Sequence, residues 1–371
     1  MRLQRESSHR FKHYSGILLF LILSGCAGSL LQKGPVDTAL PKDMPKEMQD
    51  KFEVREATSS PSQAASSLPS GFMVDAADSP TPSPVAQPES KTKLGKKKKK
   101  GKVTTPDLSA PSLAKGGEKP AQESSASNYP NRRPSKDPLW VGEKQVWDIT
   151  YFGMSAGEFT LTTLPHKVIN NRKVYHIHGD AVSSKVFSLF YRLDDKVDSF
   201  MDYLGLFSHR FHVLINESKQ TRDALELNDS DKGQTFYWNR WTHVERGTTE
   251  TKGFFPAPKF AQDSLSALFF VRAKEELKDG EVITFPVISE GNHWEAVITV
   301  LRRQMMDSPW GKVQTIVLKP EHKLQGVLQK TGDSFIWLTD DDRRYVVRLE
   351  AKVKIGTVVG SLKSVEPGVS P

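Results

Sequence analysis

Short segments that alternate apolar and polar residues recur along most of the chain after residue 137. In "QVWDITYF" this alternation places Trp147, Ile149 and Tyr151 on one face of an extended strand. The same pattern appears in "EFTLTTL", "RKVYHIHGDAV", "SHRFHVLINE", "HWEAVITVLR", "KVQTIVLK", "SFIWLT", "YVVRLEAKV" and "TVVGSL". Because Gly-, Asn- and Asp-containing turns separate these segments, the sequence predicts one mainly β domain over residues 138–363, built as an antiparallel meander.

So many strands in one meander leave sheet edges that pair with other chains unless the sheet curls or splits. We therefore expect a strongly curved sheet or a partly closed barrel. One segment, residues 263–280, departs from the pattern. It begins with Asp263, a good N-cap, and ends at a Gly, and its apolar residues recur at helical spacing (Leu265, Leu268, Phe269 and Leu277). This predicts one amphipathic helix packed on the sheet.

The first 25 residues have the features of a signal peptide. A basic start precedes the apolar run "GILLFLIL", which is too short to cross a bilayer. The run closes in "LSGC", and Cys26 is the only cysteine in the chain. This spacing resembles the bacterial lipobox, whose cysteine is lipidated and becomes the first residue of the mature protein. We expect a lipid anchor at Cys26, and Ala27 rather than Asp after it indicates the outer membrane, with the protein facing the periplasm.

Residues 26–137 are rich in Ser, Pro, Ala and Lys and have no sustained apolar period. Such a composition cannot bury enough apolar area to offset chain entropy, which predicts a disordered tether, and residues 364–371 are expected to form a disordered tail. The formal net charge of +8 arises from the signal and a basic tract in this tether, and the remainder is slightly acidic.

A run of five lysines lies at the centre of the basic tract: Lys96, Lys97, Lys98, Lys99 and Lys100. Their charge suits anionic lipid, lipopolysaccharide or peptidoglycan as a partner. The alternative is a solvated spacer block. Nucleic acid is a poor partner because export would separate the protein from the nucleic acid of the cell. In addition, no aromatic residues interleave with the lysines.

The stretch "GMSAG", residues 153–157, matches the G-x-S-x-G motif of serine hydrolases. That motif requires a strand, a sharp turn and then a helix behind the serine. Here the residues that follow Ser155 are "EFTLTTLP", an alternating threonine-rich strand. We therefore interpret the two glycines as positions that permit positive φ in a β-hairpin, and we do not expect Ser155 to be a nucleophile.

His176 and His178 lie two residues apart on one predicted strand, so their imidazoles share a face, as in some metal sites. The spacing selects no third ligand, and two polar residues on a solvated face are the commoner cause, so we expect no metal. The acids of "TDDDRR", residues 339–344, lack the spaced ligands and Gly of a calcium loop. No Gly-rich phosphate loop is present, and we expect no cofactor.

The order of these features resembles a bacterial family called domain of unknown function 3108. The resemblance rests on "GEKQVWDITYFGMSAGEFTL", "YRLDDKVDSFMD", "DSLSALFFVR" and "IWLTDDDRRYVVRLEAKVKIGTVVGSL", and it covers residues 142–362. In relatives a Pro often follows the basic residue of the last piece, where this chain has Tyr345. The resemblance implies an exported β-rich protein and an ordinary hairpin at Ser155. It implies no catalytic residues.

These observations favour an outer-membrane lipoprotein whose β domain binds an apolar or amphipathic ligand, an envelope polymer or a protein partner. The aromatic clusters "VFSLFY", residues 186–191, and "GFFPAPKF", residues 253–260, are the candidate mouths of a ligand site, although core packing explains them equally. The rival hypothesis is an envelope hydrolase acting on peptidoglycan or lipopolysaccharide, with His176, His178 or paired acids as catalytic groups. A cleft that gathers titratable groups would favour the enzyme.

Overall fold

The computed structural model describes residues 40, 44–57, 129–324, 327–329, 333–353 and 356–370. Cys26 and the lysine run 96–100 lie outside these residues, as does the predicted signal segment. In the described part of the chain, no helix is both long enough and apolar enough to span a membrane.

The domain is one antiparallel sheet, which confirms the mainly β prediction. Its first half contains β2 (Val141–Tyr151), β3 (Met154–Ile169), β4 (Arg172–Ser183), β5 (Asp194–Asp202), β6 (Ser208–Asn216), β7 (Gln220–Asp229), β8 (Gln234–His243) and β9 (Gly247–Pro256). Its second half contains β10 (Val282–Ser289), β11 (Asn292–Ser308), β12 (Gly311–Leu324), β13 (Val327–Gln329), β14 (Ser334–Thr339), β15 (Val346–Lys352) and β16 (Thr357–Val369). The spatial order runs from β10 through β12, β14–β16 and β2 to β9, so β9 and β10 are the two edges and the sheet is not closed.

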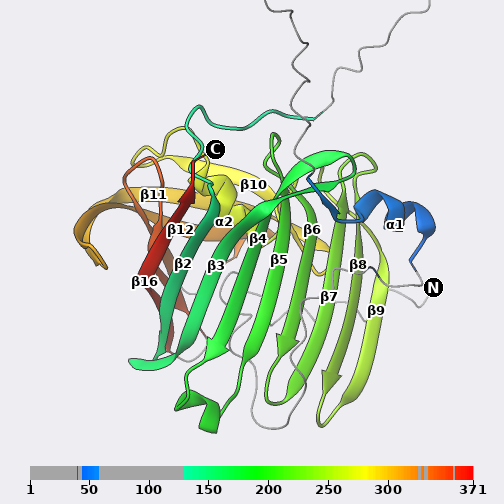
Figure 1. The fold of residues 1–371 in the computed structure, drawn as a ribbon, viewed down its shortest axis with the longest axis horizontal. Coiled ribbons are helices and arrows are strands. Elements are labelled where there is room, and N and C mark those ends of the chain that lie inside the picture. The colour runs from blue at the N-terminus through cyan, green and yellow to red at the C-terminus, as the bar shows by residue number, and fades with distance from the viewer. Residues whose placement is uncertain are drawn as a thin grey trace, which may run out of the picture. The chain divides into compact units, whose positions relative to one another are not determined.

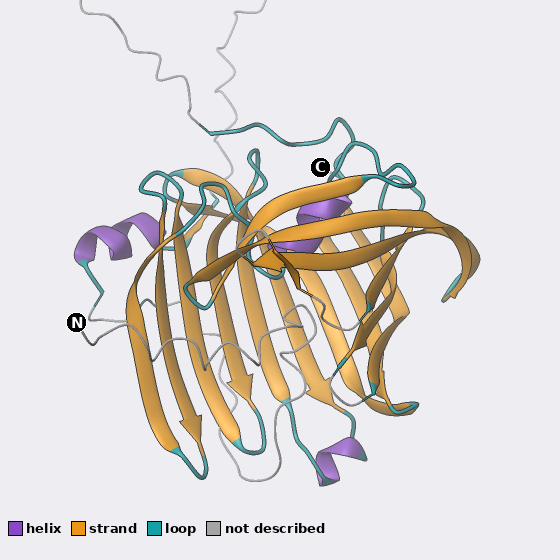
Figure 2. Cartoon of the chain, turned by 180° about the vertical axis from the view of Figure 1, so that it is seen from behind, coloured by secondary structure: helices purple, strands orange, loops and turns teal. Residues whose placement is uncertain are grey.

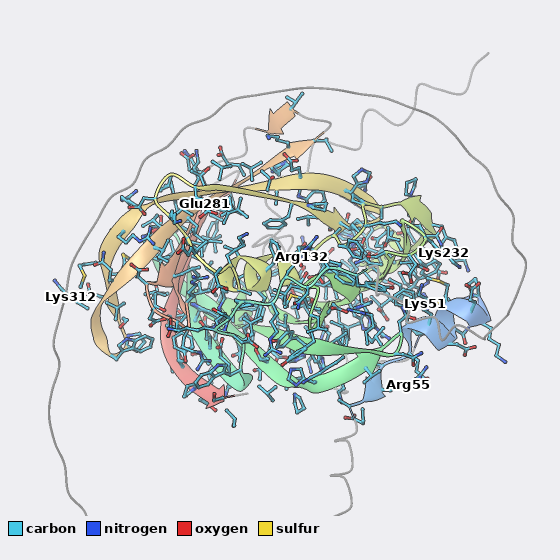
Figure 3. All side chains as sticks on the ribbon, turned by 90° about the horizontal axis from the view of Figure 1, so that it is seen from above. Lys51, Arg55, Arg132, Lys232, Glu281 and Lys312 are labelled. Atoms are coloured by element: carbon cyan, nitrogen blue, oxygen red, sulfur yellow. The ribbon has the colours of Figure 1, made fainter. Side chains whose placement is uncertain are left out.

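The sheet curls strongly, as the sequence predicts, so that β10–β12 cross over one end of the wall formed by β2–β9 (Figures 1 and 2). Helix α2 (Ser266–Arg272) lies inside this curve, and side chains fill the space around it (Figure 3). Its apolar residues Leu268, Phe269 and Val271 belong to the largest core cluster, together with residues of both halves of the sheet such as Trp147 and Ile316. The predicted helix therefore exists and supplies the centre of the core.

Helix α2 is shorter than the predicted segment 263–280. Its start is set by Asp263, whose Oδ1 accepts hydrogen bonds from the backbone nitrogens of Leu265 and Ser266 at 2.8 and 2.7 Å. Its end is set by Arg344, whose guanidinium binds the carbonyl oxygens of residues 272, 274 and 275. The last carbonyl oxygens of a helix lack partners within it, so Arg344 caps α2 at this point.

The first and last long strands, β2 and β16, pair in the middle of the sheet. Their register continues beyond Leu362 to Val365 opposite Gln145 and Val369 opposite Val141. The prediction of a disordered tail over residues 364–371 is therefore wrong as far as Val369. The reason is a long-range pairing: an isolated "SVEPGV" has little strand propensity, but an existing β2 offers it a partner along its full length.

The tether prediction is wrong in two places. Residues 46–52 form helix α1 (Lys46–Phe52), which is followed by β1 (Arg55–Glu56) paired with β3. Met44, Met48 and Phe52 pack in one cluster with Val174 of β4, on the sheet face opposite α2. The structure also describes Tyr129 to Asp137, which lie before the predicted start of the domain at residue 138. The apolar residues at spacing four give this segment a buried face that its overall composition hides.

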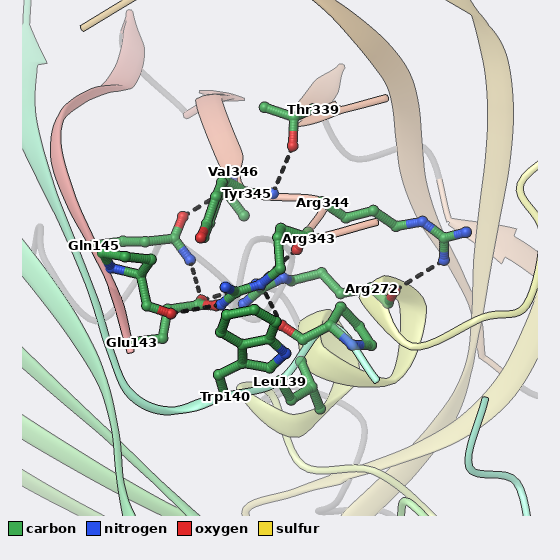
Figure 4. A network of polar contacts seen from close by, with 12 residues as sticks. Leu139, Trp140, Glu143, Gln145, Arg272, Thr339, Arg343, Arg344, Tyr345 and Val346 are labelled. Atoms are coloured by element: carbon green, nitrogen blue, oxygen red, sulfur yellow. Dashed lines mark hydrogen bonds and ion pairs between the residues drawn. The ribbon is translucent and has the colours of Figure 1, made fainter. Parts of the chain in front are cut away.

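One carboxylate joins three distant segments of the chain at the end of α2 (Figure 4). Glu143 of β2 is 2.8 Å from Arg272 of α2 and 2.6 Å from Arg343 of the turn before β15. Arg343 also stacks on Trp140, with its guanidinium carbon 3.7 Å from the ring centroid. Gln145 donates to Glu143 and accepts from the backbone nitrogen of Val346. Glu143 and Arg272 are both buried. Among the described residues Arg272 has Glu143 as its charge partner, whereas Glu143 has both Arg272 and Arg343.

We predict that Glu143→Gln lowers the free energy of unfolding by about 3–5 kcal/mol, because it leaves Arg272 buried without a counter-charge. Arg272→Met should cost less, since Arg343 still neutralises Glu143. Urea denaturation followed by tryptophan fluorescence measures both changes. The control is Lys144→Gln, which removes the exposed ion pair to Glu366 and should cost less than about 1 kcal/mol. Equal losses in Glu143→Gln and Lys144→Gln would contradict the prediction.

Candidate functional site

The candidate site lies at the seam where the two edge strands, β9 and β10, fail to pair. The segment between β9 and α2 runs along part of β10 and covers it with two hydrogen bonds. Gln262 donates its backbone N–H to Pro286 at 2.9 Å and accepts from Ile288 at 2.8 Å. Beyond this short parallel bridge, the edges stay apart and leave a cleft. The curl of the sheet thus creates an opening between residues that lie about thirty positions apart.

This opening, which we call the seam cleft, has a volume of about 720 Å³. One wall comes from the end of β9 and the following loop, and the other from the β10–β11 hairpin and the end of β12. The lining residues are Phe255, Pro256, Pro258, Thr284, Phe285, Pro286, Gly291, Asn292, His293, Trp294, Glu295, Lys323 and Leu324. Aromatic, proline and leucine side chains provide most of the apolar surface. Glu295 and Lys323 form an ion pair of 3.0 Å, so these two lining charges neutralise each other.

The β10–β11 hairpin reaches across to the opposite wall and fixes the shape of the cleft. Its turn residues Glu290 and Gly291 both have positive φ, of 55° and 71°. A Cβ at position 291 would lie 2.7 Å from the ring of Phe255, so only Gly fits beneath that ring. The backbone nitrogen of Gly291 donates to Glu226 of β7 at 2.8 Å. The hairpin is therefore anchored to β7 and β9 at once.

Glu226, which holds this hairpin, is buried between the two walls. Burial raises its pKa to about 8, against the lowering effect of the hydrogen bond from Gly291. Glu226 is therefore largely protonated at neutral pH. Nearby, Arg222 donates to Glu290 at 2.7 Å and to the hydroxyl of Tyr237 at 2.8 Å. The charged groups around the hairpin turn are thus paired or protonated, which leaves the wall behind the cleft without net charge.

The two candidate metal-binding histidines lie on the sheet face opposite α2. His176 Nε2 and His178 Nδ1 both approach Oδ1 of Asp198, at 2.7 and 2.8 Å. His178 also pairs with Asp180 at 3.0 Å. His178 has its pKa raised to about 9: burial alone would lower it, and its bonds to Asp180 and Asp198 outweigh that effect. In the described ranges, no group of three or more His, Cys, Asp or Glu residues is arranged to hold a metal ion.

Ser155 lies on β3 just after the β2–β3 turn, and its hydroxyl donates to Asp148 at 2.7 Å rather than to a histidine. The strand continues to Ile169, so no helix follows the serine. Gly153 has a φ of 73°, as the hairpin interpretation requires. Gly157 does not have positive φ; it is required because a Cβ there would collide with the carbonyl group of Val182. The motif is therefore a hairpin, although its second glycine serves close strand packing.

The acids of residues 339–344 form a turn. Asp341 Oδ1 accepts from the backbone nitrogens of Arg343 and Arg344, both at 2.9 Å, and from the hydroxyl of Thr339. Asp340 pairs with Arg303, and Asp342 with Lys136. These bonds orient Arg343 and Arg344 toward α2. The turn is therefore part of the structural network around Glu143.

Of the two aromatic clusters, residues 253–260 contribute Phe255, Pro256 and Pro258 to the seam cleft. Residues 186–191 lie at the other end of the strands and do not line it. Sequence reasoning missed the contribution of the β10–β11 hairpin, including Trp294, and the buried Glu226. The turn signal "EGN" at residues 290–292 was available, but its contact with β7 and β9 follows only from the curl of the sheet.

Comparison with solved structures finds matches with little sequence identity and low TM-scores. A β-barrel-like protein of the DUF1849 family from Brucella abortus is 10% identical, with a TM-score of 0.39, over 61% of this chain and 98% of that one. A candidate lipoprotein from Parabacteroides distasonis is 7% identical, with a TM-score of 0.28, over 64% and 100%. A candidate exported protein with a YmcC-like fold from Bacteroides fragilis is 9% identical, with a TM-score of 0.28, over 64% and 98%.

No curated protein matches the chain. Among protein families, the model described as "Protein of unknown function (DUF3108)" matches residues 146–363. This range begins within β2, includes α2 and the seam cleft, and ends within β16. Because the match spans more than half of the sequence, the chain belongs to the DUF3108 family.

Proposed function

We propose that this protein is an envelope lipoprotein whose β domain binds an apolar or amphipathic ligand in the seam cleft without catalysing a reaction. The observation that carries this proposal is the cleft itself. Its volume of about 720 Å³ falls within the range of about 300–1,000 Å³ that is typical of small-molecule sites. It also lies between two sheet edges, where a ligand can enter without unfolding a strand.

The character of the lining supports an amphipathic ligand. Phe255, Phe285 and Trp294 offer apolar surface for a hydrocarbon portion. The polar residues Asn292, His293 and Lys323 line the same cleft and suit a polar head group. Because Glu226 is largely protonated and Arg222 is paired, a hydrocarbon chain placed against the wall meets no unpaired charge.

Hydrolysis in the cleft has less support. Among the described residues that line the cleft there is no Ser or Cys, and the carboxylate of Glu295 is paired with Lys323. Ser155 bonds to Asp148, and His176 and His178 share Asp198 on the other face of the sheet. The hydroxyl, imidazole and carboxylate groups singled out from the sequence therefore do not converge on one accessible point.

The envelope location rests on the sequence. The signal segment, the lipobox-like "LSGC" and the single Cys26 support a diacylglycerol anchor, and Ala27 supports the outer membrane, with the domain on the periplasmic side. A long Ser-, Pro- and Lys-rich segment separates Cys26 from the sheet. We include in the proposal that the lysine run 96–100 contacts anionic lipid, lipopolysaccharide or peptidoglycan near the anchor.

The cleft can be tested with N-phenyl-1-naphthylamine, an apolar probe that fluoresces when it leaves water. We predict that the wild-type chain binds the probe and that Trp294→Ala weakens binding about tenfold, because it removes a large aromatic contact. The matched control is Trp310→Ala. Trp310 is exposed, whereas Trp294 is half-buried, and Trp310 lies in the β11–β12 turn, outside the cleft. Equal binding by the two variants would show that the probe occupies another site.

The protonation of Glu226 predicts a pH dependence of stability. The native pKa of about 8 lies above the ordinary value of 4.5, so the native state holds a proton that the unfolded chain releases. The contribution of Glu226 to the free energy of unfolding therefore falls as the pH rises from 4.5 to about 8. It is constant at higher pH. We predict that Glu226→Gln, measured by urea denaturation, gains stability relative to the wild type from about pH 5 to about pH 9. Glu295→Gln should show no such trend, and parallel profiles for Glu226→Gln and the wild type would contradict the prediction.

The anchor has its own test. We predict that Cys26→Ser moves the protein from the membrane fraction to the soluble envelope fraction, since two acyl chains supply the stable attachment. Cell fractionation and immunoblotting measure the change. Replacing Lys96–Lys100 with Gln should leave the lipidated protein in the membrane fraction. Retention of the Cys26→Ser protein in washed membranes would show that another element anchors it.

A further inference from the structure

Four turns stand side by side at the end of the strands away from the seam cleft (Figure 1). They are the β2–β3, β4–β5, β6–β7 and β8–β9 turns, which share one end because successive strands are antiparallel. Backbone hydrogen bonds connect neighbouring turns into a row: Ser184 N to Ala156 O at 2.8 Å, Ser218 N to Arg192 O at 2.9 Å and Val244 N to Lys219 O at 3.0 Å. We call this row the turn edge.

Two of these turns present large apolar side chains to solvent. In the β4–β5 loop, Val186, Leu189 and Phe190 are 71%, 81% and 75% exposed. In the adjacent β2–β3 turn, Phe152 and Met154 are 59% and 64% exposed. A single exposed apolar residue on a surface is ordinary, but five at two neighbouring turns concentrate apolar side chains at this edge, and in soluble proteins such a concentration marks an interaction surface.

The β4–β5 loop is held rigidly in this conformation. Phe187 and Tyr191, which alternate with the exposed residues, pack against Ala181 and Leu193. The hydroxyl of Tyr191 donates to Glu217 of the next turn. The 3-10 helix Phe187–Leu189 is closed by hydrogen bonds to the carbonyl of Phe187. The loop therefore uses two aromatic residues as supports and directs the remaining apolar side chains outward.

The turn edge also carries a basic excess. Lys185, Arg192, Lys219 and Arg246 lie in its turns and form no ion pair within the described ranges, while its exposed or half-buried acids are Asp194 and Glu245. The exposed apolar tips cluster at β2–β5, and Lys219 and Arg246 continue the row at β6–β9. The exposed apolar side chains suit the hydrocarbon layer of a membrane. The basic side chains in the same row suit its anionic head groups.

We propose that the turn edge docks on the surface of an anionic lipid bilayer, with Leu189, Phe190 and their neighbours inserted among the acyl chains. The basic side chains then contact the head groups. This inference goes beyond ligand binding, because it concerns a second surface. Strand β9 runs from Gly247 in the turn edge to Phe255 in the seam cleft, so docking would leave the cleft open on the side away from the membrane.

The single cysteine allows a direct test on the full mature chain. We would use the Cys26→Ser chain with Lys96–Lys100 replaced by Gln, so that neither the anchor nor the lysine run contributes. In this background, Leu189→Cys is labelled with the environment-sensitive dye NBD, and Trp310→Cys serves as the matched control. On titration with vesicles of phosphatidylethanolamine and phosphatidylglycerol, we expect the emission at position 189 to shift to the blue and that at position 310 to stay unchanged.

Two further comparisons identify what the edge recognises. The double change Leu189→Ser and Phe190→Ser should weaken vesicle binding about tenfold or more, measured by flotation, because it removes the inserted side chains. Binding should also weaken with added salt and on vesicles of phosphatidylcholine alone. Naphthylamine binding should be unchanged, which shows that the variant is folded and separates this test from that of the cleft. The proposal would be overturned if the emission of the label at position 189 does not shift to the blue with saturating vesicles. It would also be overturned if the emission shifts without lipid as the protein concentration rises, because that result indicates a contact between copies of the chain.

Discussion

The ion pairs of Glu143 are the interaction on which the rest of the domain depends. A curled sheet that does not close has no continuous ladder of hydrogen bonds to fix its curvature, so the curvature must be fixed by what lies inside. Glu143 connects β2 to α2 through Arg272 and to the turn before β15 through Arg343. Because α2 carries the centre of the core, the position of this helix sets how far β10–β12 fold over the opposite wall, and hence the width of the seam cleft.

The sequence predicted the strands, their meander and the curved sheet because alternation is a local signal. It also predicted α2 from Asp263 and the apolar spacing, although Arg344, some seventy residues away, decides where the helix ends. Helix α1 was missed since its short apolar face, Met44, Met48 and Phe52, has no partner until the sheet exists. The end of β16 was missed for the same reason. In both places tertiary contact overrides a composition typical of disorder.

The candidate site was predicted in part. The cluster at residues 253–260 was singled out for its aromatic residues, and Phe255 does line the cleft. The second wall could not be derived, because the approach of β10–β11 to β7 depends on the three-dimensional curl and not on the order of the strands. Glu226 resembles any other polar residue in an alternating strand, and its burial depends on the hairpin that covers it. The resemblance to the DUF3108 family accounted for the order of the motifs but assigned no chemistry to them.

The pairing of β2 with β16 has a consequence for how the chain acquires its structure. Residues 141–256 make mostly contacts between successive strands, so these strands can pair one after another along the chain. Among the described strands, the second half of the sheet pairs with the first through the final strand, more than two hundred residues after β2. Its folding therefore waits for the C-terminus and involves a large loop closure, which makes that step slow. Until then β2 presents one unpaired edge that other chains in the same state can join, so a chaperone that covers sheet edges would protect this stage of folding.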